Sequence, residues 1–165
     1  NLLANLKEIK NYFLKKENFF YLTIILIIFS LDRISKREII SNFNESVYFV
    51  NDYINFDLIW NIGIGFGFLS TDSSILYNSI TLLIGIVILF LFYVLISSEK
   101  IDKIIYSIII GGALGNYYDR LVYKAVPDFI DLHYNNFHWF TFNVADIFIS
   151  IGIIVLLIYG LLKKN

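Results

Sequence analysis

Two short repeats place amide and carboxyl side chains at one spacing. The sequence contains Asn-x-x-Asp at Asn116 and Asp119, and again at Asn143 and Asp146. Because residues three apart on a helix share a face, each Asn is expected on the same face as its Asp. Two carboxyls that lie close together at low dielectric share a proton and titrate as a pair. Peptide hydrolysis by two aspartates needs this state: one Asp takes a proton from water while the other polarises the scissile carbonyl and protonates the leaving amine.

The spacing by itself does not separate hydrolysis from two other roles. Buried Asp side chains and Arg120 can simply bind one another between helices, and carboxyls inside a membrane also form proton paths. Carriers often show inverted repeats with broken helices, whereas this sequence shows only the short Asn-x-x-Asp repeat. At this point a small proton-coupled transporter is the alternative to a protease.

The composition indicates that membrane helices position these residues. Of 165 residues, 58% are hydrophobic, and there is no Cys, which excludes a thiol nucleophile, disulfides and thiolate metal sites. The basic residues form no patch that would predict binding to nucleic acid. We expect a single integral membrane domain over residues 1–165.

Four uncharged runs predict four transmembrane helices. The longest run, residues 73–98, holds 26 residues and exceeds the roughly 20 that cross a bilayer. The other three runs are residues 18–31, 104–118 and 147–162, and next to them lie Asp32, Asp119 and Asp146, respectively. Each of these runs reaches spanning length only if the helix takes its Asp into the membrane. The spans are predicted at about 18–38, 74–98, 104–123 and 143–162.

The distribution of basic residues predicts that both termini are cytoplasmic, since Lys and Arg favour that side. The residues assigned to the cytoplasm are Lys7, Lys10, Lys15, Lys16, Lys100, Lys103, Lys163 and Lys164. Those assigned to the outer side are Arg33, Lys36, Arg37, Arg120 and Lys124. A rise of 1.5 Å per residue places Asp119 roughly 22 Å, and Asp146 roughly 24 Å, from the cytoplasmic ends of their helices. Both carboxyls are therefore expected in the outer leaflet.

Two segments are expected outside the spans. Residues 1–17 predict an interfacial helix with one apolar face, formed by Leu2, Leu6, Ile9 and Phe13. Residues 40–73 predict an outer, β-rich segment, because apolar side chains alternate with polar ones between Tyr53 and Trp60. The fold class is thus an α-helical membrane protein with four spans, a small outer sheet and an interfacial helix.

Five sequence blocks carry a resemblance to a known family. They are Leu31-Asp32-Arg33-Ile34-Ser35-Lys36, Asn61-Ile62-Gly63-Ile64-Gly65-Phe66-Gly67, Gly111-Gly112-Ala113-Leu114-Gly115-Asn116-Tyr117-Tyr118-Asp119-Arg120, Val126-Pro127-Asp128-Phe129-Ile130-Asp131 and Phe142-Asn143-Val144-Ala145-Asp146. In this order they resemble bacterial lipoprotein signal peptidase, or signal peptidase II, over residues 19–162. The resemblance implies an aspartic endopeptidase of the bacterial inner membrane that cleaves signal peptides from prolipoproteins, just before a diacylglyceryl-modified Cys.

The resemblance also implies roles for individual residues. It makes Asp119 and Asp146 the catalytic pair, with the active site towards the outer face. It implies substrate binding or support for Asp32, Lys36, Asn61, Gly63, Asn116, Arg120, Asp128 and Asn143. We assign no metal and no cofactor, and we expect a monomer whose partners are lipid-modified prolipoproteins and membrane lipids.

Three further features lie near these blocks. Gly111 and Gly115 have the small-xxx-small spacing that predicts close packing between helices. The glycine-rich stretch up to Gly67 is expected to form a flexible outer loop beside the site. His133 and His138 have no carboxylate at the spacing of a zinc site, so we interpret them as surface histidines.

Overall fold

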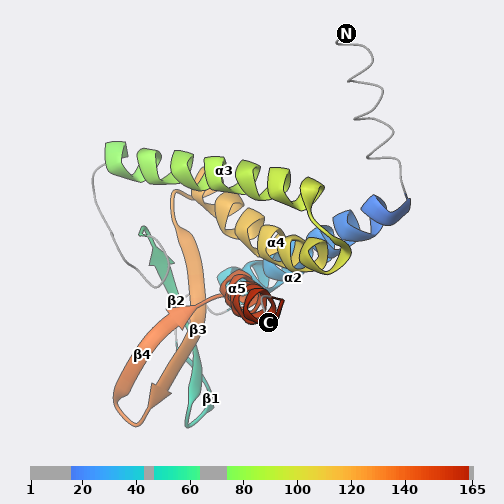
Figure 1. The fold of residues 1–165 in the computed structure, drawn as a ribbon. Helices are drawn as coiled ribbons and strands as arrows, with labels where there is room; N and C mark the ends of the chain where they lie inside the picture. Colours follow the sequence, from blue (N-terminus) through green and yellow to red (C-terminus); the bar gives the residue numbers. More distant parts are fainter. Residues whose placement is uncertain (1–15, 43–46, 64–73, 164–165) are drawn as a thin grey trace.

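Four helices and one small sheet make up the part of the chain that the computed structural model describes, residues 16–42, 47–63 and 74–163 (Figure 1). The helices are α2 (Lys16–Asn42), α3 (Ser74–Ser97), α4 (Lys100–Val122) and α5 (Val144–Leu162). They lie close to the four predicted spans, although α2 continues to Asn42 because no Gly or Pro interrupts it. Residues 1–15 of the expected interfacial helix and residues 64–67 of the expected loop lie outside the described residues.

Three of these helices are long and apolar enough to cross a membrane, namely Asn18–Asn42, Ile75–Ser97 and Val144–Leu162. The helix α4 has spanning length but is less apolar, since its last two turns hold Asn116, Asp119 and Arg120. It packs against α2, α3 and α5, and this central position removes Asp119 and Arg120 from the surface, with exposures of 0% and 5%. The polar part of α4 is therefore covered by protein.

Glycines on α4 allow the helices to approach closely. A Cβ atom at Gly111 would lie 2.8 Å from the Cβ of Ile28 on α2, and one at Gly115 would overlap the Asp32 carboxyl. On the face of α4 that packs against α5, a Cβ at Gly112 would lie 2.7 Å from the backbone oxygen of Ala145. The predicted close packing at Gly111 and Gly115 is confirmed, and its partner is α2.

We expect Gly115→Ala to lower the unfolding temperature. The added methyl group would overlap the Asp32 side chain, whose Cγ is 2.9 Å from the Cβ position, and overpacking of a tight interface costs about 1–3 kcal/mol. The measurement is thermal unfolding in detergent. Gly160→Ala is the matched control, because a Cβ at Gly160 meets no atom within 4 Å. Equal unfolding temperatures for the two variants would contradict the packing argument.

The sheet is antiparallel and has the strand order β1-β2-β3-β4. Its strands are β1 (Tyr48–Asn51), β2 (Ile54–Asn61), β3 (Val126–Tyr134) and β4 (Phe137–Phe142). The strand predicted between Tyr53 and Trp60 is confirmed as β2. The sequence analysis did not predict β3 and β4, which lie between α4 and α5, because β3 is buried along most of its length and so lacks simple alternation.

The interpretation of both histidines as surface residues is wrong for His133. Its side chain is 6% exposed, and its ring stacks on that of His138 with 5.4 Å between the ring centres. The two residues are register partners on β3 and β4, and the Asp131 carboxylate lies 2.7 Å from Nδ1 of His138. Strand pairing therefore buries one of the two rings.

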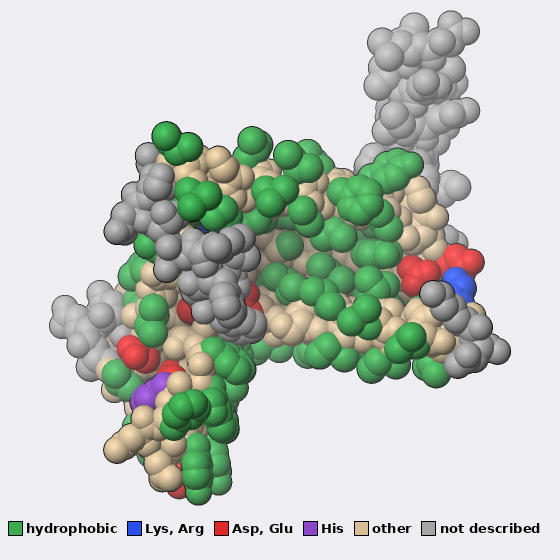
Figure 2. Space-filling model, turned by 60° about the vertical axis from the view of Figure 1, so that its left-hand side comes forward, with side chains coloured by type: hydrophobic (Ala, Val, Ile, Leu, Met, Phe, Trp, Pro, Cys, Tyr) green, Lys and Arg blue, Asp and Glu red, His purple; other side chains and the backbone are tan. Residues whose placement is uncertain are grey.

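On the face that Figure 2 shows, hydrophobic side chains lie along most of the length of the helices. Phe19 on α2, Leu89 on α3 and Leu157 on α5 have exposures of 69%, 70% and 63%. Large apolar side chains face outwards when the solvent is lipid rather than water. Figure 1 shows the sheet projecting from one end of this bundle, where β3 contacts both α2 and α4.

Candidate active site

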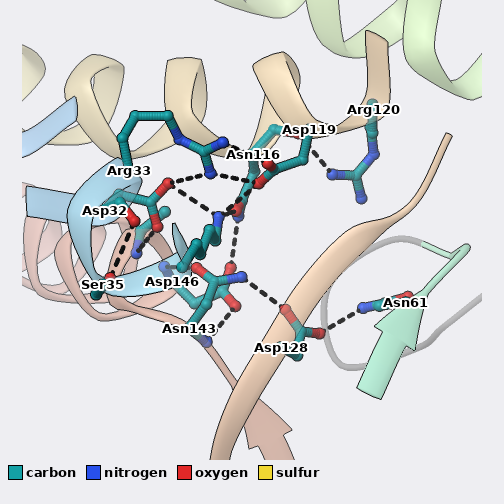
Figure 3. A network of polar contacts seen from close by, with 12 residues as sticks. Asp32, Arg33, Ser35, Asn61, Asn116, Asp119, Arg120, Asp128, Asn143 and Asp146 are labelled. Carbon is teal, nitrogen blue, oxygen red and sulfur yellow. Dashed lines mark hydrogen bonds and ion pairs between the residues drawn. The ribbon is translucent and has the colours of Figure 1, made fainter. Parts of the chain in front are cut away.

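Carboxyl groups from three helices converge at the end of the bundle next to the sheet (Figure 3). Asp32 comes from the middle of α2, Asp119 from the last turn of α4 and Asp146 from the first turn of α5. Asp32 and Asp119 are completely buried, at 0% exposure. Buried carboxyls require partners, so their contacts indicate how the site is held together.

Asp119 is bound by two cationic side chains from α2. The ammonium of Lys36 donates to Asp119 Oδ2 at 2.8 Å. The guanidinium of Arg33 reaches both carboxylate oxygens, with Nη2 2.9 Å from Oδ2 and Nη1 2.6 Å from Oδ1. The contact at Oδ2 is a hydrogen bond, whereas the contact at Oδ1 is an ion pair without hydrogen-bond geometry among the described residues.

Asp32 connects Lys36 to the start of α5. Asp32 and Lys36 are one helical turn apart on α2, and the ammonium donates to Asp32 Oδ2 at 2.9 Å. The other carboxylate oxygen, Oδ1, accepts a hydrogen bond of 3.1 Å from the backbone N–H of Ala145. Asp32 therefore orients the Lys36 ammonium and also satisfies one of the free N–H groups at the N-terminus of α5.

Asp146 is held by two Asn side chains. Asn143 is the N-cap of α5: its side-chain oxygen accepts from the Asp146 N–H at 3.1 Å, and Asp146 Oδ2 accepts from the Asn143 N–H at 3.1 Å. This reciprocal pair is a capping box, which fixes Asp146 at the third helical position. The other oxygen, Oδ1, accepts from Asn116 Nδ2 at 2.8 Å.

Asn116 joins the two halves of the site. Its side-chain oxygen accepts from the Lys36 ammonium at 2.7 Å, while its Nδ2 donates to Asp146. The amide of the first repeat thus binds the carboxyl of the second repeat, because Lys36 enters from α2 and lies between Asn116 and Asp119. Asp119 and Asp146 are connected through Lys36 and Asn116, and proton sharing between the two carboxyls stays a prediction.

The sheet supplies a further carboxylate, Asp128, which binds Asn143. Asp128 on β3 accepts a hydrogen bond of 2.6 Å from Asn143 Nδ2 and one of 2.9 Å from Asn61 Nδ2 on β2. The Asn61 side-chain oxygen in turn accepts from the N–H of Gly63 at 2.8 Å. Asp128 therefore connects the N-cap of α5 to the end of β2.

Arg120 points away from the Asp119 carboxyl and binds backbone. Its Nη2 donates to the carbonyl oxygen of Gly63 at 2.7 Å, and its Nη1 donates to the carbonyl oxygen of Asn116 at 3.3 Å. The hydroxyl of Tyr77 on α3 donates to the Arg120 backbone oxygen at 3.2 Å. Arg120 thus holds the segment after β2 against α4.

The Asp128 carboxyl, on β3 and outside the helices, has a raised pKa. Burial raises the pKa of the Asp128 carboxyl from the usual 3.8 to about 6, and the Asp146 charge adds to the rise, against the lowering by its two amide partners. In the folded state the proton is held more tightly than in the unfolded chain. The contribution of Asp128 to stability therefore falls as the pH rises from about 4 to about 6.

We expect Asp128→Asn to remove this part of the pH dependence. Relative to wild type, the variant should gain stability between about pH 4 and pH 6, by up to about 3 kcal/mol, because it has no charge to bury. Thermal unfolding across this pH range measures the difference. Asp52→Asn, which alters an exposed carboxylate at the turn after β1, should show no such gain. A constant difference between wild type and Asp128→Asn would exclude this titration.

Cavities lie on either side of the carboxyl pair. A groove of about 290 Å³ has Asp146 among its lining residues and is otherwise lined mainly by apolar residues, among them Phe142, Ile147, Ile151 and Ile154. Because Ile147, Ile151 and Ile154 share one face of α5 and Phe142 belongs to β4, the groove is formed by α5 and β4 beside the Asp146 carboxyl. A second cavity, about 520 Å³, is lined by Lys36 and Arg33 on the Asp119 side.

The structure brings together every residue that the sequence analysis assigned to the site. The network runs through Asp32, Lys36, Asn61, Gly63, Asn116, Asp119, Arg120, Asp128, Asn143 and Asp146. Arg33 was missed as a member, although its guanidinium contacts both Asp32 and Asp119. The sequence feature that could have identified Arg33 is its charge inside a predicted span, directly after Asp32.

Comparisons with known proteins agree with this geometry. The family model described as signal peptidase (SPase) II matches residues 24–162. A lipoprotein signal peptidase of Pelagibacter ubique is 45% identical over 161 residues, which is 96% of this chain and 93% of that protein. One of Francisella tularensis subsp. novicida is 34% identical over 154 residues, covering 91% and 95%.

Solved structures show the same fold. A bacterial membrane enzyme determined by the in meso method at 2.3 Å resolution superposes with a TM-score of 0.72 and 27% identity, over 88% of this chain and 89% of that one. A second, at 1.9 Å resolution, has the same TM-score with 26% identity, over 88% and 94%. The family match covers Asp32, Asp119 and Asp146 and the parts of α2, α4 and α5 around them. The chain therefore belongs to the signal peptidase II family.

Proposed function

We propose that the chain is an aspartic endopeptidase that removes signal peptides from diacylglyceryl-modified prolipoproteins, cleaving before the lipidated Cys. The observation that carries the proposal is the placement of Asp119 and Asp146 on neighbouring helices, joined through Lys36 and Asn116 at one end of a hydrophobic bundle. The curated relatives carry the name lipoprotein signal peptidase, which supports the same substrate class.

The chemistry follows from the two carboxyls acting in opposite protonation states. One Asp takes a proton from a water molecule, whose oxygen attacks the scissile carbonyl, while the other donates a proton to the carbonyl oxygen. The tetrahedral adduct then collapses, and a proton passes to the leaving amine as the C–N bond breaks. The side chains of Lys36 and Asn116 and the backbone N–H of Asn143 hold the carboxyls in place during these steps.

The surroundings support a substrate that arrives from the lipid. The groove beside Asp146 is lined chiefly by apolar side chains, which suits the hydrophobic segment of a signal peptide. Entry from the side would bring the cleavage point to the carboxyl pair without passing the apolar segment through water. A proton carrier gains no support from the comparisons, since the family model and the relatives described above are peptidases.

The topology that fits this function has four spans in one domain of the bacterial inner membrane: the three candidate spans and, in addition, α4. Support comes from the enclosure of α4 by three candidate spans. Lys163 after α5 binds Glu99 before α4 at 2.9 Å, so Lys163 lies at the same end of the bundle as Lys100 and Lys103, away from Asp119. Under the positive-inside rule this end is cytoplasmic, and the active site faces outwards.

The decisive experiment is cleavage of a synthetic prolipoprotein by the purified chain in detergent. We expect release of the signal peptide from the diacylglyceryl-modified precursor and much slower release from the same precursor with an unmodified Cys. Mass spectrometry of both fragments should place the cut before the modified Cys. Equal rates on the two precursors would remove the lipid from the proposed recognition, and the absence of cleavage would contradict the enzyme assignment.

A further inference from the structure

The second cavity, of about 520 Å³, has a different character from the groove at Asp146. It lies between α2 and α4, and cationic and aromatic side chains line it: Arg33, Lys36, Arg37, Phe29, Tyr118 and Tyr123. No carboxylate is among its described lining residues. A cavity with this lining favours an anion that also carries an apolar part.

The cationic residues of the cavity differ in whether they already bind a carboxylate. Lys36 and Arg33 bind Asp32 and Asp119, which balances their charge. Within the described part of the chain, Arg37 pairs with no carboxylate, and its side chain is exposed. The Nε of Arg33 is buried and has no hydrogen-bond acceptor among the described residues. The cavity thus has one unbalanced positive charge and a spare N–H donor.

The order of residues along α2 matches the order of groups in a phospholipid. Phe29, Arg33 and Arg37 follow one another at single-turn spacing, about 6 Å apart along the axis. Phe29 lies deepest in the span and meets the ring of Tyr118 edge-on at 6.1 Å, and Arg33 lies 4.8 Å above the same ring. An acyl chain would contact the aromatic end, and a phosphate would lie beside the arginines.

The position of the cavity favours a membrane lipid over a soluble anion. Ile34 and Leu26, on α2 beside the cavity, are 66% and 54% exposed, so this part of the helix faces lipid. Arginine binds phosphate oxygens through its planar fork of N–H donors. We propose that this cavity binds the phosphodiester headgroup of an anionic membrane phospholipid, with Arg37 as its principal ligand. The cavity shares Arg33 and Lys36 with the surroundings of Asp119, whereas Arg37 contacts neither carboxyl of the proposed pair among the described residues, and the test of lipid binding needs no peptide substrate.

The test measures lipid binding to the full chain in neutral detergent by native mass spectrometry. The probes are phosphatidylglycerol and phosphatidylcholine with identical acyl chains. We expect phosphatidylglycerol to bind more tightly, and Arg37→Gln to weaken its binding about tenfold, as expected for loss of a charged hydrogen-bond donor. Lys124→Gln makes the same charge change after α4 but outside the cavity lining, and it should leave binding within about twofold of wild type.

Three results would overturn the proposal. The first is equal affinity for the two lipids, and the second is an equal loss of binding in Arg37→Gln and Lys124→Gln, which would indicate attraction to overall charge alone. The third is displacement of phosphatidylglycerol by inorganic phosphate at constant ionic strength, which would make a soluble anion the occupant. Because Arg37 is exposed, the unfolding temperature of Arg37→Gln should match wild type, so a loss of binding reports on the cavity.

Discussion

Asp119→Asn and Asp146→Asn should each abolish release of the signal peptide from a lipidated prolipoprotein. An amide cannot take the proton from water or deliver one to the leaving amine, and loss of such a group costs about 10²–10⁴-fold in rate. The change keeps the volume of the side chain, and in Asp146→Asn the amide oxygen can still accept the hydrogen bond from Asn116. Asp119→Asn also removes the negative charge that Lys36 and Arg33 bind, so we expect it to be less stable than Asp146→Asn. The rate of fragment release from the folded fraction measures the effect.

A matched control comes from the same helix as the first member of the pair. Asp102→Asn makes the same substitution in the first turn of α4, far from the site, and should keep full activity. Thermal unfolding of all three variants separates loss of chemistry from loss of structure. Substantial turnover by either Asp119→Asn or Asp146→Asn would show that the pair does not carry out the reaction.

Replacing Lys36 should have the largest effect on stability. Its ammonium is 1% exposed and lies 2.9 Å from Asp32 and 2.8 Å from Asp119. Lys36→Met keeps much of the side-chain volume but leaves two buried carboxylates without this partner. Loss of one member of a buried ion pair costs about 3–5 kcal/mol. We expect a large fall in the unfolding temperature in detergent, together with loss of cleavage.

A double variant tests the cause of that loss. Adding Asp32→Asn to Lys36→Met removes one of the two unbalanced charges, so part of the lost stability should return while cleavage stays absent. Lys100→Met, at the exposed start of α4, controls for the loss of a lysine. Wild-type stability in Lys36→Met would contradict the charge network, and restored cleavage in the double variant would remove Lys36 from the support of the site.

Much of the site could be predicted because its signals are local in the chain. An Asp beside an uncharged run that is too short to span must enter the membrane, and this criterion identified Asp32, Asp119 and Asp146. The Asn143 cap could also be anticipated, because a capping box involves residues three apart on one helix. Such arguments need only helical geometry and the cost of burying charge.

Contacts between residues that are distant in the chain could not be predicted from the sequence. The partner of Asn116 is Asp146 on another helix, and which way an amide turns depends on the Lys36 ammonium that enters from α2. The role of Arg33 likewise depends on the rotation of α2 relative to α4, which brings it to Asp119. Helix rotation follows from packing at positions such as Gly115, and a hydropathy pattern does not contain it.

The sequence by itself determined the helices, the alternating strand and the aspartates that had to be buried, because length, charge and periodicity act over a few turns. Only the tertiary structure decided that β3 pairs with β2, that Lys36 and Asn116 lie between Asp119 and Asp146, and that cavities of opposite character flank the pair. These features depend on side chains from separate elements meeting in space, so local patterns could not reveal them.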